Sequence, residues 1–76
     1  MEIRVCGPGC ANCVKAAMVV QEALAAAAVP ASVTKVTDFA EMAALGVLTT
    51  PAIVIDGVVK CVGRVPSKQD VLSWIQ

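Results

Sequence analysis

The sequence has no histidine, no excess of either charge and only two aromatic residues, Phe39 and Trp74. Six lysines and arginines balance six aspartates and glutamates, and like charges form no run. Nucleic acids and anionic membranes both attract a positive protein surface, so we expect neither as a partner. The lack of histidine and the irregular spacing of the four cysteines also argue against a structural zinc site.

Long hydrophobic runs and an export signal are missing too. The longest stretch of low charge, residues 14–29, contains Lys15, Gln21 and Glu22 and is too short to cross about 30 Å of hydrocarbon. Residues 1–6 alternate in the manner of a strand, unlike a cationic leader followed by an apolar run. We therefore expect a cytoplasmic protein whose 76 residues form one domain, 1–76.

Hydrophobic periodicity and helix-cap patterns predict alternating strands and helices. Asp38 with Glu41, and Ser67 with Asp70, have the spacing of capping boxes, and Asp56-Gly57 suits the type I′ turn of a β-hairpin. The predicted elements are a strand over 1–6, a helix over 11–28, a strand over 31–37, a short helix over 38–45, strands over 51–55 and 58–62, and a terminal helix after Ser67.

This βαβαββα order predicts an α/β fold with a four-stranded mixed sheet. A right-handed crossover makes the first two strands parallel, and the hairpin adds two antiparallel strands. The simplest strand order is 2-1-3-4, with helices on both faces of the sheet. In that order Thr50 and Pro51, at the start of the third strand, lie beside the end of the first strand. The cysteine-containing loop and the proline are therefore expected to be neighbours.

Cys10 and Cys13 form a Cys-x-x-Cys motif where the first strand gives way to the first helix. Helical residues three apart have Cβ atoms about 5–6 Å apart, whereas a disulfide requires about 3.5–4.5 Å. Cys10 is therefore expected at the N-cap, after the bend supplied by residues 7–9. The unpaired N–H groups and the helix dipole at that position lower a thiol pKa from about 8.5 into the range of about 3.5–7.5. We predict that Cys10 is the nucleophile and that the more buried Cys13 is the resolving thiol.

Two other interpretations of the motif stay open at this point. Both cysteines can be small hydrophobic residues of the core, although the Gly-Pro-Gly turn before them argues against this. The motif also suits a non-catalytic carrier of a soft metal such as Cu(I), because ferredoxin-like metallochaperones display Cys-x-x-Cys before a helix. Those domains end on a strand, whereas this sequence predicts a terminal helix containing Trp74. Thiol chemistry without a cofactor or resident metal is the favoured interpretation.

Three segments together carry a resemblance to a known family over essentially the whole chain: Gly7-Pro8-Gly9-Cys10-Ala11-Asn12-Cys13, Thr50-Pro51-Ala52 before Val54-Ile55-Asp56-Gly57, and Gly63-Arg64-Val65-Pro66-Ser67. The sequence resembles the thioredoxin-like superfamily, and specifically its small redox-active disulfide proteins. The resemblance implies a minimal thioredoxin/glutaredoxin-like fold and thiol-disulfide oxidoreductase activity, with Cys10 attacking and Cys13 resolving. It also implies that Pro51 is the cis-proline and that Thr50, Pro51 and Gly63 contact the substrate.

The sequence departs from thioredoxins around the motif. Ala11 and Asn12 replace the Gly-Pro pair between the cysteines, no tryptophan precedes Cys10, and the first strand has no aspartate to accept a proton. We therefore expect proton transfer through water and weak or narrow activity on protein disulfides. The expected partners are a disulfide-containing protein or small molecule and an electron-donating reductase or thiol, and the chain is expected to be a monomer. Of the other cysteines, we expect Cys6 to be buried packing and Cys61 to be a passive thiol at the sheet edge.

Overall fold

Seven elements follow one another in the computed structural model, which describes all of residues 1–76. Their βαβαββα order is the predicted one, and their ends differ from the predicted ends by about a residue. The elements are β1 (Glu2–Cys6), α1 (Ala11–Ala27), β2 (Ser32–Val36), α2 (Phe39–Ala44), β3 (Ala52–Ile55), β4 (Val58–Val62) and α3 (Lys68–Ile75).

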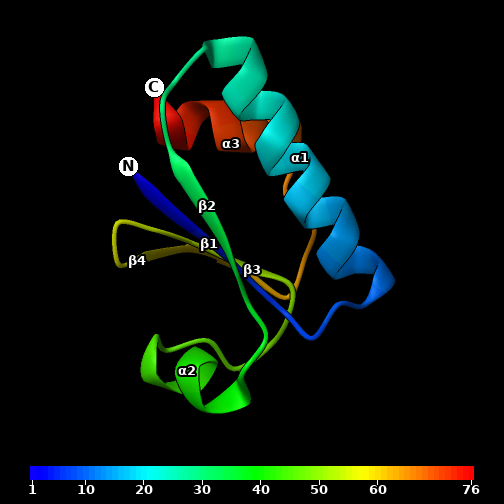
Figure 1. The fold of residues 1–76 in the computed structure, drawn as a ribbon. Helices are drawn as coiled ribbons and strands as arrows, with labels where there is room; N and C mark the ends of the chain where they lie inside the picture. The colour runs from blue at the N-terminus through cyan, green and yellow to red at the C-terminus, as the bar shows by residue number, and fades with distance from the viewer.

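The four strands form one mixed sheet in the order β2-β1-β3-β4, which confirms the predicted topology. β1 and β2 are parallel, whereas the β1–β3 and β3–β4 pairs are antiparallel. α1 and α3 cover one face of the sheet, and α2 lies against the other face (Figure 1). Cys6 at the end of β1 pairs with Ala52 at the start of β3. The chain after Cys6 and the chain before Ala52 therefore meet at one end of the sheet.

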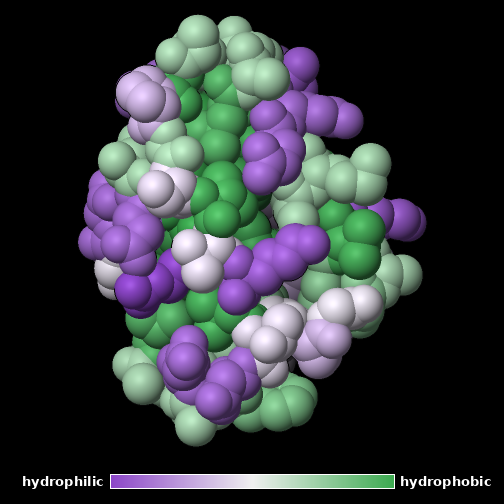
Figure 2. Space-filling view, viewed as in Figure 1, coloured by the Kyte–Doolittle hydropathy of each residue, from purple (hydrophilic) through white to green (hydrophobic).

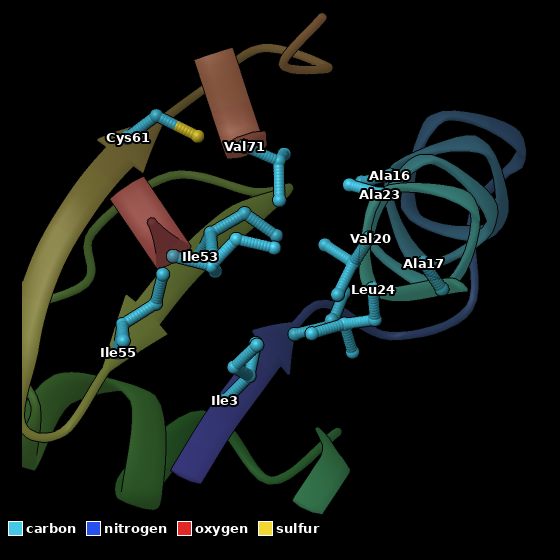
Figure 3. Packing of buried hydrophobic residues seen from close by; sticks show 12 residues of the cluster. Ile3, Ala16, Ala17, Val20, Ala23, Leu24, Ile53, Ile55, Cys61 and Val71 are labelled. Carbon is cyan, nitrogen blue, oxygen red and sulfur yellow. The ribbon is translucent and has the colours of Figure 1, made fainter. Parts of the chain in front are cut away.

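Buried hydrophobic residues form two layers, one on each face of the sheet. Ile3 and Val5 of β1 belong to the layer under α1 and α3, whereas Cys6 belongs to the layer under α2. Figure 3 shows Val20 and Leu24 of α1 facing Ile3 in the first layer. All of β3 is buried, because helices cover both faces of this inner strand. This is why residues 52–55 lack the alternation typical of a half-exposed strand.

α1 has the buried stripe that the sequence predicts. Cys13, Ala17, Val20 and Leu24 are buried, and Ala27 is half-buried. Two further alanines widen the buried face and allow the helix to approach the sheet closely: Ala16 and Ala23. At 17 residues α1 is the longest helix, and none of the three helices has the length and hydropathy needed to cross a membrane.

Local hydrogen bonds define the turn and the helix starts. Asp56 (φ 49°) and Gly57 (φ 83°) both have positive φ, as the predicted type I′ turn requires. Ser67 and Asp70 form both hydrogen bonds of the predicted capping box of α3. The other predicted box is incomplete: Asp38 is the N-cap of α2, but its carboxylate accepts from the Ala40 N–H at 2.8 Å and takes no bond from position 41. A short aspartate side chain at the N-cap reaches the second helical N–H as readily as the third.

Candidate active site

Cys10 and Cys13 form a disulfide at the N-terminus of α1, with their Cα atoms 5.0 Å apart. Cys10 is the N-cap residue and has extended backbone angles, φ −66° and ψ 167°. This conformation turns its side chain back toward Cys13, which lies one turn inside the helix. Cys10 is exposed to solvent, whereas Cys13 is only 6% exposed. The pair is therefore asymmetric, with one sulfur open to a substrate and the other covered.

The backbone at the start of α1 favours negative charge on the Cys10 sulfur. The Cys13 N–H donates a hydrogen bond to Cys10 Sγ over 3.2 Å. In the reduced protein the same N–H group and the positive end of the helix dipole stabilise a thiolate at Cys10. No acidic residue in the first turn opposes this effect. Thiolate is the form of cysteine that attacks a disulfide.

Gly7 contacts the buried sulfur, a role that the sequence analysis missed. A Cβ atom on Gly7 would overlap Cys13 Sγ, and it would lie 3.0 Å from the Cβ of Cys13 and 3.6 Å from the Cβ of Thr50. The Gly7 N–H donates to the Val36 carbonyl over 2.9 Å, which ties this part of the loop to the end of β2. Only a residue without a side chain fits between Cys13 and Thr50. A glycine directly after a strand and before a Cys-x-x-Cys motif is the sequence signal of this contact.

Thr50 and Pro51 lie beside the cysteine pair, where the predicted topology places them. The peptide bond between them is cis, and Pro51 is buried while Thr50 is half-buried. The Pro51 carbonyl accepts a hydrogen bond of 2.8 Å from the Gly63 N–H. Gly63 (φ 74°) packs closely on Thr49, since a Cβ at Gly63 would lie 3.0 Å from Thr49 Oγ1. The structure therefore brings the motif, the Thr50-Pro51 segment and Gly63 together, and adds Thr49 to them.

The other two cysteines are free and lie outside this site. Cys6 is fully buried, as expected. Burial raises the pKa of its thiol, and the positive charge of Arg4 lowers it by a smaller amount. Cys61 is on the edge strand, as expected, but its side chain points inward toward Val71 of α3 (Figure 3) and is 7% exposed. Burial likewise raises the pKa of the Cys61 thiol, with Arg64 acting in the opposite direction. Burial and a raised pKa both disfavour disulfide exchange by these two thiols.

Arg64, which follows Gly63, is held by the cap of α3. Its guanidinium donates to the Asp70 carboxylate over 3.1 Å, and the same carboxylate oxygen accepts from the Ser67 N–H. These hydrogen bonds, from Arg64 first and Ser67 second, lower the pKa of Asp70. The charge of Arg64 is therefore engaged within the chain next to the site.

Comparisons with known proteins agree with this geometry. The model of the thioredoxin domain family matches residues 1–76. The chain belongs to the thioredoxin-like family. It is also 31% identical over 71 residues to a thioredoxin of Methanothermobacter thermautotrophicus, in an alignment that covers 93% of this chain and 92% of that protein. The superfamily that the sequence resembles is thereby confirmed. Membership of the thioredoxin-like family, together with the Cys10–Cys13 disulfide, supports a thiol-disulfide redox role.

Proposed function

We propose that this protein is a thiol-disulfide oxidoreductase in which Cys10 attacks the substrate and Cys13 resolves the intermediate. The observation that carries the proposal is the difference in exposure between two sulfurs close enough to bond. An exposed thiolate at an N-cap reaches a substrate disulfide, whereas a buried neighbour is protected from side reactions until the mixed disulfide has formed.

The reaction proceeds in two exchanges that conserve electrons. The Cys10 thiolate attacks one sulfur of the substrate disulfide, a Cys10–substrate disulfide forms, and the other substrate sulfur leaves as a thiolate that takes a proton from solvent. The Cys13 thiol then loses its proton and attacks Cys10 Sγ. The Cys10–Cys13 bond forms, the bond to the substrate breaks, and two electrons have passed from the protein dithiol to the substrate. An external reductase or thiol returns the pair to the reduced form.

Thr50, Pro51 and Gly63 are the proposed substrate contacts. None of the hydrogen bonds formed by loop backbone or by side chains involves Thr50, so its N–H and C=O are free to pair with an extended substrate segment. Gly63, which has no side chain, lies close against Thr49 and donates its N–H to the Pro51 carbonyl, so its backbone borders the proposed contact surface. Leu48, two residues before Thr50, is 89% exposed and offers an apolar contact. This surface suits a substrate disulfide in a flexible protein segment or in a small molecule. The protein would act on it as a monomer in the reducing cytoplasm.

The assigned nucleophile is tested by replacing Cys10. We expect Cys10→Ser to lower dithiothreitol-coupled reduction of a protein disulfide to the uncatalysed rate, because the exposed thiolate is lost. Cys13→Ser should retain the first exchange and accumulate a mixed disulfide that is detectable by mass spectrometry. Cys61→Ala, which also removes one sulfur, is the matched control and should keep full activity. Unchanged reductase activity of Cys10→Ser rejects the mechanism.

Soft-metal carriage by the same two sulfurs is the alternative function. The βαβαββα order of the elements differs from that of the metallochaperones that share the motif. This difference favours redox chemistry. A carrier would bind Cu(I) tightly and show no reductase activity, so metal content after purification under reducing conditions, measured alongside the disulfide assay, separates the two functions.

A further inference from the structure

A small cavity lies directly beside Cys13, between the first turn of α1 and the edge of the sheet. Its volume is about 40 Å³, which is enough for at least one water molecule. Residues of β1, β2, α1 and the loop before α1 line it: Val5, Gly7, Gly9, Cys13, Val14, Ala17, Lys35 and Thr37. Lys35 and Thr37, from β2 and its end, carry the polar side chains of this lining besides Cys13 itself. The cavity therefore has room for water next to the buried sulfur, with Lys35 on its β2 side.

The strand register places Lys35 on the same side of the sheet as Cys13. Lys35 pairs with Val5 across the parallel β1–β2 ladder, and side chains of paired residues project to the same face. Val5 belongs to the layer under α1, so Lys35 also projects toward α1. Because β2 is an edge strand, the lysine stem lies along the groove between β2 and α1. In the space-filling view hydrophobic residues are visible in this hollow, with hydrophilic residues along its rims (Figure 2).

Lys35 is the charged group best placed to act on Cys13. It forms no ion pair, since the two salt bridges of the chain are Arg4–Glu2 and Arg64–Asp70. Among the residues that line the cavity, only Cys13 and Lys35 are ionisable. The loop formed by residues 49–51 has no ionisable side chain.

The other ionisable groups near the start of α1 lie farther along or on other faces. Glu22 shares the open part of the groove with Lys35 but does not line the cavity at Cys13. Lys15 is exposed on α1 and lines neither space. Arg4 and Cys6 of β1 face the opposite side of the sheet. In the reduced protein, Cys10 is the remaining ionisable neighbour of Cys13.

The geometry points to Lys35 as an electrostatic partner of the resolving thiol, an inference that rests on the proposed function. Its ammonium group, acting across the water-accessible cavity, stabilises the Cys13 thiolate in the step that breaks the mixed disulfide. In that step the Cys13 S–H passes its proton to water in the cavity and on to solvent. Cys13 Sγ then bonds to Cys10 Sγ, and the substrate thiolate leaves. Lys35 neither gains nor loses a covalent bond, so it acts through Cys13 and is not itself a catalytic residue.

The role fits the absence of an acidic residue beside Cys13. No aspartate or glutamate lines the cavity, so water is the proton acceptor that the structure leaves available to Cys13. A proton lost to water leaves a negative sulfur in a largely apolar wall, which is unfavourable without a compensating charge. Lys35 supplies that charge from the β2 side of the cavity.

The inference is tested by titrating Cys13 in a Cys10→Ser background, where no disulfide forms. The pKa of Cys13 is obtained from the pH dependence of alkylation by iodoacetamide, with fragment-ion mass spectrometry to separate Cys13 from Cys6. We expect Lys35→Gln to raise this pKa by about 0.5 to 1 unit, a range that allows for solvent screening of an exposed lysine. At neutral pH the alkylation rate should fall about three- to tenfold, in proportion to the thiolate fraction.

Two matched variants decide whether charge at position 35 is responsible. Lys15→Gln removes the same charge from the exposed side of α1 and should move the pKa of Cys13 clearly less than Lys35→Gln does. Lys35→Arg keeps the charge and should leave Cys13 close to its parent value. An equal rise in Lys15→Gln, an equal rise in Lys35→Arg, or no rise in Lys35→Gln overturns the inference. Circular dichroism of each variant checks that the fold is retained.

A kinetic readout separates this inference from the proposed function. When reduced protein with both cysteines is mixed with a stoichiometric aromatic disulfide, attack by Cys10 releases one coloured thiolate and resolution by Cys13 releases the second. At a pH below the ordinary pKa of a thiol, Lys35→Gln should slow the second phase about three- to tenfold and leave the first phase unchanged. A parent protein without the first phase contradicts the proposed function. Two unaffected phases in Lys35→Gln contradict only the role of Lys35.

Discussion

Cys10 and Cys13 have opposite environments although only one helical turn separates them. The N-cap position exposes Cys10 and directs an N–H group at its sulfur, whereas Cys13 packs against the Gly7 backbone. A single local difference, extended against helical backbone, thus produces two thiols suited to attack and to resolution. The chemistry proposed for the pair depends on this asymmetry more than on the identity of Ala11 and Asn12 between them.

The contact between Gly7 and Cys13 predicts a large effect of a single methyl group. Gly7→Ala should lower the free energy of unfolding by about 1–3 kcal/mol, the range for overpacking of a tightly packed site. The cause is overlap of the new Cβ with Cys13 Sγ. Chemical denaturation of the parent and the variant measures the difference.

A double-mutant cycle identifies the sulfur as the origin of that cost. In a Cys13→Ala background the overlapping atom is gone, so Gly7→Ala should be less destabilising there than in the parent protein. Equal costs in both backgrounds would show that the destabilisation comes from the backbone at position 7 and not from the sulfur.

At the scale of elements, the cap of α3 connects the end of the proposed substrate surface to the rest of the chain. Ser67 and Asp70 exchange hydrogen bonds at the start of the helix, and Arg64 adds an ion pair to the same carboxylate. Gly63, which precedes this cluster, donates to the Pro51 carbonyl. The cap therefore anchors the segment that follows Gly63, and α3 in turn packs on α1.

The carboxylate of Asp70 predicts a pH dependence of stability. Its pKa is lower in the folded protein than the ordinary value of 3.8, so the charged form is favoured by folding. The resulting stabilisation is present above 3.8 and is lost as the pH falls through the lower, folded-state pKa. Asp70→Asn should be less stable than the parent at neutral pH and should lose less stability on acidification.

Thermal melts of the parent and Asp70→Asn over the acidic range measure this effect. Asp38→Asn is the matched control, because it replaces an aspartate at the start of α2 by another good N-cap residue and leaves the Arg64 pair intact. The same change in acid sensitivity for both variants would contradict the assignment to Asp70.

For the whole molecule, the packing of α1 on the sheet decides where the disulfide lies. The larger buried layer joins α1, α3, β1 and β3, and its central side chains include Val20, Ile3 and Ile53 (Figure 3). This layer holds the N-terminus of α1 over the end of β1, next to the start of β3. The site is thus assembled from segments that only the folded sheet brings together.

Truncation within this layer should destabilise the entire fold. Val20 has no exposed surface, so Val20→Ala is expected to lower the free energy of unfolding by about 1–3 kcal/mol through lost burial and the cavity that remains. Val58→Ala makes the same chemical change at a side chain that is 55% exposed and should cost under about 0.5 kcal/mol. Urea denaturation of both variants gives the comparison, and similar costs would argue against the central place of Val20 in the core.

The sequence by itself determined the features that neighbouring residues encode. The Asp56-Gly57 turn, the Ser67–Asp70 cap and the placement of Cys10 at a helix N-cap were all predictable, because backbone preference and hydrogen bonds within a few residues specify them. The element order then limited the sheet to one simple topology. The same local signals predicted a full capping box at Asp38. There the carboxylate accepts a hydrogen bond from the nearer Ala40 N–H, and the expected bond with position 41 is absent.

Only the tertiary structure decided which distant residues surround the buried sulfur. The contact of Gly7 with both Cys13 and Thr50, the projection of Lys35 toward the cavity, and the inward burial of Cys61 each depend on strand pairing and register. A shift of one residue in β2 would turn Lys35 to the opposite face of the sheet. Pairing energies of this kind arise between segments that are distant in sequence and are summed over the whole sheet, so no local pattern reveals them.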